Sequence, residues 1–550
     1  MKKFTTALFT LALVCLCFLQ FPVKTQAAAK QVKGEYNGVS WVYNTGTKTL
    51  TVSGNTAIER TRDDLDQDVE IPWHKYRASI QKVVIKKGIT GIGGGTFYRM
   101  PKLTSVSIPN TVTYITGDAF LQCTSLKKIS IPDSVTRLGG NVFHDTAWWN
   151  AQPENQVIYL GKIAYNMKGW PKKAITIKKG TVAIAEYAFY CQNDIKSVTI
   201  PNTVKYIGKE AFSSCITLKS LTSPASVREI GDNAFYECYN ITKLTISKGV
   251  KTIGENAFRR CLKLKNISLP DTVQQVGENA FYDTAWWKNQ KSGKVIYAGK
   301  IAYSFKGKLP ASVALKSGTV GLADGLFQNS KTLKNVTIPE SVKVIGDSAF
   351  YNCTKLQTVT VKSKAVTIGN KAFYNCRALK NLSFKGNITT IGDEAFADCV
   401  ALTEISLGTK LTSIGKQAFR GCGKLKEIRM PNTVVSVGTD AFVCCSRLEK
   451  VVLSTRLTTI ERGLFSQCYR LKSITIPKRV TTIKQAAFYT CCDLQSVKLP
   501  ASLKTIEKWA FDECEVLQKI QYTGTKAQWK KIKVTAPYPV FKNAEVTYNA

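Results

Sequence analysis

The stretch Leu333–Cys353, LKNVTIPESVKVIGDSAFYNC, contains the repeating unit of this chain. Closely similar text returns at Leu264–Phe281, Leu379–Cys399 and Leu402–Cys422. The most constant mark of the unit is a phenylalanine that usually follows an alanine, and neighbouring marks are separated by 23 residues or by twice 23. The chain is therefore built from one repeat in a single register. The marks are Phe97, Phe120, Phe143, Phe189, Phe212, Phe235, Phe258, Phe281, Phe327, Phe350, Phe373, Phe396, Phe419, Phe442, Phe465, Phe488 and Phe511.

The positions within the unit indicate how each turn folds. A period of this length with apolar residues at fixed offsets is typical of a leucine-rich repeat solenoid. Leu333, Val336 and Ile338 have the spacing of a short half-buried strand, and Gly346 indicates a sharp turn. We expect a repeat solenoid, mainly β with short 3₁₀ or helical turns, with parallel strands along one wall and β caps at both ends. The phenylalanines predicted to form its core are Phe97, Phe120, Phe212, Phe235, Phe258, Phe350, Phe373, Phe396, Phe419, Phe442, Phe465, Phe488 and Phe511.

The repeat resembles that of a known family. The pattern I-P-x-x-V-x-x-I-G-x-x-A-F-x-x-C-x-x-L is similar to the BspA-like (Treponema-type) leucine-rich repeat, and the resemblance extends from about Ser79 to the end of the chain. It implies a secreted or surface protein of the kind made by bacteria and some mucosal protists. It also implies an adhesin role, because several members of the family bind host matrix proteins or other bacteria.

The segments outside the repeats predict export and two caps. Residues 1–29 have the charged start, short apolar core and small-residue end of a bacterial, Gram-positive type signal peptide, and no later run is long enough to span a membrane. Residues 30–79 contain a predicted β-hairpin and are interpreted as the N-terminal β cap, because a solenoid end exposes its core; a separate binding domain is the alternative. Repeats occupy 80–521, and 522–550 are interpreted as the C-terminal cap.

Two variant slots, near 144–188 and 282–326, interrupt the rhythm of the repeats. Each begins with the text D-T-A-W-W, and the two copies lie 138 residues apart, which is six periods, so a block of six turns was duplicated. The paired tryptophans are a candidate aromatic patch for stacking on sugars; the alternative is that they pack over the variant turn. They are Trp148, Trp149, Trp286 and Trp287.

The charge of the chain is strongly basic. Lysine and arginine number 77 against 38 aspartates and glutamates, which gives a formal net charge of +39. One repeat offset, just before the first strand, carries lysine in many turns and predicts a line of positive charge along one rim. This candidate binding rim is either an electrostatic track for an anionic polymer or a solubilising surface that protects strand edges. Its members are Lys127, Lys196, Lys219, Lys265, Lys334, Lys380, Lys426 and Lys472.

The cysteines follow the repeat, and most of them lie three residues after a register phenylalanine. Residues with the same surroundings in every turn have no preferred partner, so we expect buried free thiols in place of a disulfide framework. No zinc spacing, nucleophile elbow or phosphate-binding glycine loop is present. The sequence therefore predicts no enzyme activity, no catalytic residue, no metal and no cofactor.

These observations lead to two expected functions. The first is an exported, non-catalytic binding protein, a secreted or cell-surface adhesin that recognises a host or microbial macromolecule through the solenoid wall. The alternative is a cell-envelope structural protein held on anionic wall polymer by its basic surface. The expected partner is thus a protein or an anionic glycan or wall polymer, not a specific nucleic acid, and the protein is expected to be a monomer.

Overall fold

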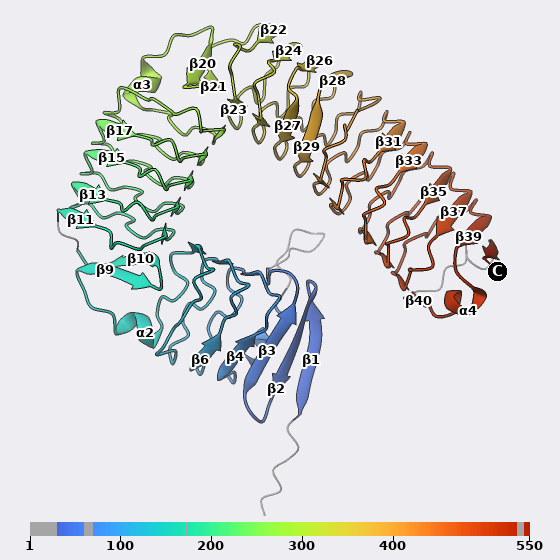
Figure 1. The fold of residues 1–550 in the computed structure, drawn as a ribbon, viewed down its shortest axis with the longest axis horizontal. Coiled ribbons are helices and arrows are strands. Elements are labelled where there is room, and N and C mark those ends of the chain that lie inside the picture. The colour runs from blue at the N-terminus through green and yellow to red at the C-terminus, as the bar shows by residue number, and fades with distance from the viewer. Residues whose placement is uncertain (1–29, 60–69, 171–172, 536–543, 550) are drawn as a thin grey trace, which may run out of the picture. The chain divides into compact units, whose positions relative to one another are not determined.

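The computed structural model describes residues 30–59, 70–170, 173–535 and 544–549. The predicted signal peptide lies outside these residues. The chain divides into two compact units, Met1–Gln152 and Pro153–Ala550, and each unit is a coil of short parallel strands (Figure 1).

The first unit begins with an antiparallel sheet. Strands β1, β2 and β3 pair antiparallel, and β3 then pairs parallel with the first repeat strand, β4. The antiparallel strands of this segment and the first parallel strands of the repeats therefore belong to one mixed sheet. The elements of this unit are β1 (Gln31–Tyr36), β2 (Val39–Asn44), β3 (Thr49–Gly54), η1 (His74–Tyr76), β4 (Lys82–Ile85), β5 (Gly91–Ile92), β6 (Ser105–Ser107), β7 (Tyr114–Ile115), β8 (Arg137–Leu138) and α2 (Ala147–Asn150).

The second unit has two ladders of parallel strands, on opposite sides of the coil (Figure 1). We call them the outer and inner ladders, from their positions on the bend of this unit. The outer ladder contains β11 (Ala174–Thr176), β13 (Ser197–Thr199), β15 (Ser220–Thr222), β17 (Lys243–Thr245), β22 (Ser312–Ala314), β24 (Asn335–Ile338), β26 (Thr358–Val361), β28 (Asn381–Phe384), β31 (Glu427–Arg429), β33 (Lys450–Val452), β35 (Ser473–Thr475), β37 (Ser496–Leu499), β39 (Lys519–Tyr522) and β41 (Glu545–Tyr548). The inner ladder contains β12 (Ala183–Ile184), β14 (Tyr206–Ile207), β16 (Glu229–Ile230), β18 (Thr252–Ile253), β19 (Gln275–Val276), β23 (Gly321–Leu322), β25 (Val344–Ile345), β27 (Ala365–Ile368), β29 (Asn387–Ile391), β30 (Ser413–Ile414), β32 (Ser436–Val437), β34 (Thr459–Ile460), β36 (Thr482–Ile483), β38 (Thr505–Ile506) and β40 (Lys533–Val534).

The two variant slots contain hairpins. Strands β9 (Gln156–Leu160) and β10 (Ile163–Lys168) form the first, and β20 (Val295–Ala298) and β21 (Ile301–Phe305) form the second. In each hairpin the second strand continues the inner ladder, because β10 pairs parallel with β12 and β21 with β23. The remaining helices are α3 (Ala285–Lys288) and α4 (Lys526–Trp529).

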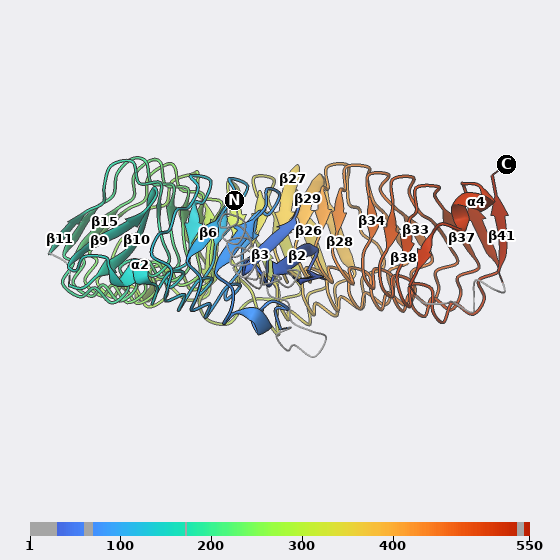
Figure 2. The same ribbon diagram turned by 90° about the horizontal axis from the view of Figure 1, so that it is seen from below.

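The sequence predicted strands along one wall, and the structure adds the inner ladder. The outer ladder is divided into sheets of two to four strands, whereas the inner ladder holds runs of up to eight. Figure 2 shows the coil from a second side. Bending spreads the outer edges of the turns, and a ladder tolerates only about 4.8 Å between neighbouring strands. The outer ladder is therefore interrupted more often than the inner one, since it falls into five sheets and the inner ladder into three.

Stacked phenylalanines form the core of each turn. In the second unit the Phe373 ring lies 4.9 Å from that of Phe350 and 5.2 Å from that of Phe396, with nearly parallel planes. All the phenylalanines predicted for the core are fully buried. In the first unit the column begins on Trp73, whose ring stacks on Phe97 at 6.2 Å. Trp73 thus covers the end of the core, as a cap must.

The register cysteines lie beside this column as free, buried thiols. The Sγ of Cys353 donates to the carbonyl oxygen of Phe327 at 3.0 Å, and Cys376 donates to Phe350 at 3.1 Å. Burial raises the pKa of Cys353 to about 12. The Cys353 and Cys376 thiols therefore each satisfy one backbone carbonyl of the preceding turn, and their raised pKa values keep both thiols protonated at neutral pH.

Candidate binding surface

The predicted rim lysines stand on stacked turns. All eight side chains are exposed. The backbone N–H of Lys219 donates to the carbonyl oxygen of Lys196 at 3.2 Å, and that of Lys196 donates to Lys173 at 2.7 Å. Lys173, which is not among the eight predicted rim lysines, therefore occupies the same offset inside the first variant slot. Its position 23 residues before Lys196 is the signal that identifies it.

Further along the second unit the row is spaced by two turns. Lys380 and Lys334 are joined through Gln357, whose backbone bonds to both at 2.7 and 3.1 Å. Two strand spacings amount to about 10 Å, which is close to the screening length in physiological salt. Neighbouring lysines in this part therefore repel one another only weakly. The alternating lysines are Lys334, Lys380, Lys426 and Lys472.

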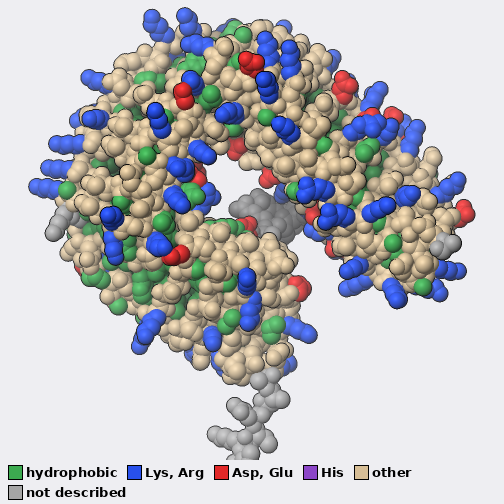
Figure 3. All heavy atoms as spheres, in the orientation of Figure 1, with side chains coloured by type: hydrophobic (Ala, Val, Ile, Leu, Met, Phe, Trp, Pro, Cys, Tyr) green, Lys and Arg blue, Asp and Glu red, His purple; other side chains and the backbone are tan. Residues whose placement is uncertain are grey.

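Few acidic groups neutralise this row. Within the described residues none of the eight rim lysines takes part in an ion pair. Figure 3 shows lysine and arginine side chains standing out along the outer edge of the second unit. The row is therefore available to an external anion.

Carboxylates of the inner ladder are used differently. Asp232, Asp324, Asp347 and Asp393 each accept the backbone N–H of a residue in the next turn, at 2.7–2.8 Å. Burial and the nearby Asp347 raise the pKa of Asp324 to about 7. These acids stabilise the turns, and they separate the negative charge of the inner ladder from the lysines of the outer one.

The tryptophan pairs pack against the ends of the phenylalanine columns. Trp286 lies edge-on to Phe281 at 5.9 Å, and Trp287 lies edge-on to Tyr303 at 6.1 Å. In the first unit Trp148 contacts Phe143 in the same way, at 6.1 Å, and Trp149 is buried. Thr146 and Thr284 cap the helices that carry the pairs. This packing favours the structural interpretation of the pairs over an open stacking platform.

One hollow brings a rim lysine and a predicted tryptophan together. Lys127, Lys128 and Trp148 line a hollow of about 1070 Å³ in the first unit, together with serine and threonine side chains of β6 and the next turn. Residues 127–131 form no strand, which leaves space beside β6. The hollow thus places the Trp148 indole beside hydroxyl and ammonium groups.

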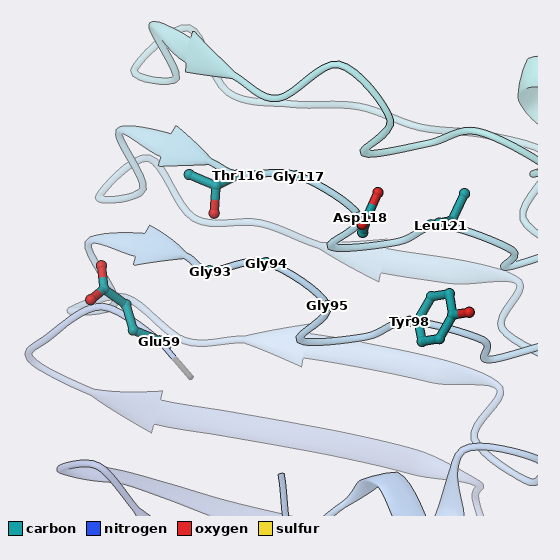
Figure 4. A pocket seen from close by; sticks show the side chains of 9 residues that line it. All are labelled: Glu59, Gly93, Gly94, Gly95, Tyr98, Thr116, Gly117, Asp118 and Leu121. Carbon is teal, nitrogen blue, oxygen red and sulfur yellow. The ribbon is translucent and has the colours of Figure 1, made fainter. Parts of the chain in front are cut away.

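A second hollow in the first unit contains none of the predicted residues (Figure 4). It has a volume of about 500 Å³ and is lined by Gly93, Gly94, Gly95 and Gly117, with Glu59, Tyr98, Thr116, Asp118 and Leu121. Glu59 accepts a hydrogen bond of 2.5 Å from the Tyr114 hydroxyl, and burial together with Glu59 raises the pKa of Tyr114 to about 12. The hollow exists because glycines leave no side chains to fill it.

Two features are absent from the described residues. No group of three or more histidine, cysteine, aspartate or glutamate side chains is placed to hold a metal ion. The helices of the described segments are all too short or too polar to cross a membrane.

Comparison with known proteins gives a family match over most of the chain. The model described as "BspA type Leucine rich repeat region (6 copies)" matches residues 74–182, 182–296, 299–422 and 389–518. No curated protein matches.

Solved structures to which this chain is similar include a leucine-rich cell surface protein from Faecalibacterium prausnitzii, with 20% sequence identity over 92% of this chain and 99% of that chain and a TM-score of 0.25. They also include a leucine-rich repeat protein from Bacteroides ovatus, with 17% sequence identity over 95% of this chain and 98% of that chain and a TM-score of 0.21. A third is the pneumococcal vaccine antigen PcpA, with 17% sequence identity over 95% of this chain and 100% of that chain and a TM-score of 0.23.

Proposed function

Because this chain belongs to the family of BspA-type leucine-rich repeat proteins, we propose that it is an exported, surface-associated binding protein without catalytic activity. Its leading role is that of an adhesin, which recognises a host or microbial macromolecule through the wall of the solenoid. Repeat solenoids provide long continuous surfaces of the kind that large partners require. The signal peptide at 1–29 and a monomeric state belong to this proposal.

The observation that carries the proposal is the row of exposed lysines at one repeat offset. These lysines form no ion pairs within the described residues, whereas aspartates of the inner ladder are bonded to the backbone. A repeated, uncompensated charge attracts a partner that carries repeated negative charge. A protein with an acidic face and an acidic glycan both meet this description.

The same row favours a second candidate function, retention on the anionic polymer of a cell envelope. A flexible polyanion bridges several lysines at once and releases counterions as it binds. The gain at each exposed lysine is small, so attachment depends on the array. A specific nucleic-acid role is not proposed, because the chain contains no nucleic-acid recognition motif.

Binding to protein and glycan arrays over a range of salt concentrations tests both candidates. The comparison uses the wild type and a variant in which Lys196, Lys219, Lys265, Lys380, Lys426 and Lys472 are changed to glutamine. We expect the variant to bind long anionic polymers more weakly, with a flatter dependence on salt, and to fold normally because these side chains are exposed.

The outcomes separate the two roles. A protein ligand that stays bound at high salt supports the adhesin, whereas loss of all binding at moderate salt supports retention on wall polymer. Equal binding by both proteins at every salt concentration contradicts a role for the lysine row. The absence of any ligand contradicts the binding function as a whole.

A further inference from the structure

A cluster of four lysines surrounds one hollow in the second unit, directly after the β20–β21 hairpin. Lys308, Lys331, Lys334 and Lys355 line a space of about 520 Å³, together with Thr332 and the chain segments at Gly293 and 309–311. We call it the lysine hollow. Only Lys334 belongs to the predicted rim.

The backbone around the lysine hollow is fixed by the ladder. Strand β22 pairs with β24 in the register Ser312 opposite Asn335. The backbone N–H of Lys334 donates to the carbonyl oxygen of Ala311 at 2.7 Å. The hydroxyl of Thr332 donates to the carbonyl oxygen of Leu309 at 2.8 Å. Lys308 and Lys331 stand 23 residues apart at one offset, on adjacent turns. The lysines are thus attached to a rigid frame although their side chains are exposed.

The positive charge of the lysine hollow has no internal counter-charge. Its lining contains no aspartate or glutamate, and within the described residues none of its lysines forms an ion pair. Other lysines of the same unit do pair, such as Lys300 with Asp271 at 2.6 Å and Lys484 with Glu461 at 2.6 Å. Four like charges around one space repel one another, and a bound anion removes that repulsion.

The duplicated block supplies an internal comparison. Residues 138 positions earlier occupy the corresponding places after the β9–β10 hairpin. They are Trp170, Asn193, Lys196 and Thr217. Three of the four lysines are therefore absent from the first copy, and Trp170 there is 71% exposed. In the first copy Lys173 stands at the place of Ala311, so the two copies differ in which positions carry lysine, and the arrangement of these four lysines does not follow from the repeat.

From these observations we propose that the lysine hollow is the primary binding site for a linear polymer bearing sulfate or phosphate esters. The ammonium group of lysine offers three donors without a preferred plane, and it binds such esters as a point charge. The volume lies within the range of ligand pockets and exceeds the needs of a single ion. Lys334 also belongs to the alternating row, so a long chain seated in the hollow can continue along Lys380 and Lys426. This inference rests on the second candidate function, because it names the ligand class and its point of entry.

The test compares two triple variants with the same change of charge. One is Lys308→Gln/Lys331→Gln/Lys355→Gln in the hollow, and the other is Lys380→Gln/Lys426→Gln/Lys472→Gln in the row. The probes are a sulfated octasaccharide and a glycerol phosphate octamer, measured by calorimetry at physiological salt on the full chain. We expect the hollow variant to bind the preferred probe at least about tenfold more weakly, because three charge-assisted contacts are lost, and the row variant to change by less than about twofold. The two probes decide whether sulfate or phosphate is the natural group.

Further variants and probes distinguish a failure of the lysine hollow as a binding site from a failure of polymer retention as a whole. The variant Lys308→Arg/Lys331→Arg/Lys355→Arg should retain binding, and thermal melting by circular dichroism should be unchanged for every variant. Equal losses in both glutamine variants overturn the proposal in favour of diffuse charge. Failure of the short probes while long wall polymer still binds also overturns it, and leaves retention on the polymer intact. Failure of every anionic polymer overturns both. A single-stranded oligonucleotide of equal charge that binds as tightly through the same lysines overturns the assignment of the ligand class.

Discussion

Replacement of Phe396 by alanine should cause one of the largest losses of stability available in this protein. The ring is completely buried. It stacks between Phe373 at 5.2 Å and Phe419 at 5.3 Å, with interplanar angles of 3° and 12°. Removal of a core phenylalanine typically costs about 3–5 kcal/mol, and each stacked pair contributes about 0.5–1.5 kcal/mol beyond burial. Because two pairs are lost, we expect a loss near the upper end, about 4–5 kcal/mol.

Two control variants separate stacking from burial. Phe189, the first register phenylalanine of the second unit, is also fully buried. Within the described residues its ring stacks on one ring, that of Phe212 at 4.8 Å, so Phe189→Ala should cost about 1 kcal/mol less. Phe396→Leu retains most of the volume and should cost about 1–2 kcal/mol. Urea unfolding followed by circular dichroism measures all three, with hydrogen exchange to detect separate unfolding of part of the array. A loss below about 1.5 kcal/mol for Phe396→Ala would refute the account of the core as one stacked column.

Two further predictions concern ionisable groups. Cys376, Cys399 and Cys422 should resist alkylation in the native protein up to about pH 9, because burial holds their pKa values far above the usual range. The exposed Cys191 and Cys492 should react. Mass spectrometry of alkylated, unreduced protein checks this, and disulfides between neighbouring turns would contradict it. Asp324 has a native pKa raised from 3.8 to about 7, so its contribution to stability is full below about pH 4 and is lost as the pH rises through 7. Asp324→Asn keeps a side-chain oxygen that can accept the N–H of Asp347, and its urea midpoint relative to the wild type should therefore rise between pH 4 and pH 8. Parallel pH profiles for the two proteins would show that Asp324 ionises normally.

The repeat offset explains why so much of the core was predictable. A residue that returns every 23 positions meets the same surroundings in every turn, so Phe350, Phe396 and Cys353 could be assigned to the interior from spacing alone. The same argument placed Lys334 and Lys380 at the surface. It missed Lys173, because that lysine lies inside a variant slot where the surrounding pattern is lost.

Features that depend on the course of the chain between turns were decided by the tertiary structure. The inner ladder uses strands as short as two residues, such as Val344–Ile345, which are too short to show an alternating pattern. Packing of the α3 tryptophans on Phe281 and Tyr303 depends on the position of the β20–β21 hairpin. The spacing of residues in the repeat does not predict that position.

Sequence by itself therefore determined the solenoid, its phenylalanine column and its basic rim, because these follow from one offset repeated many times. Only the folded chain decided the lysine hollow. Lys308, Lys334 and Lys355 come from three different offsets on three turns, and they line one space because the segment after the second hairpin returns to the outer ladder beside them. Lysines at different repeat offsets come together only when the backbone hydrogen bonds between turns fix the distance from one turn to the next.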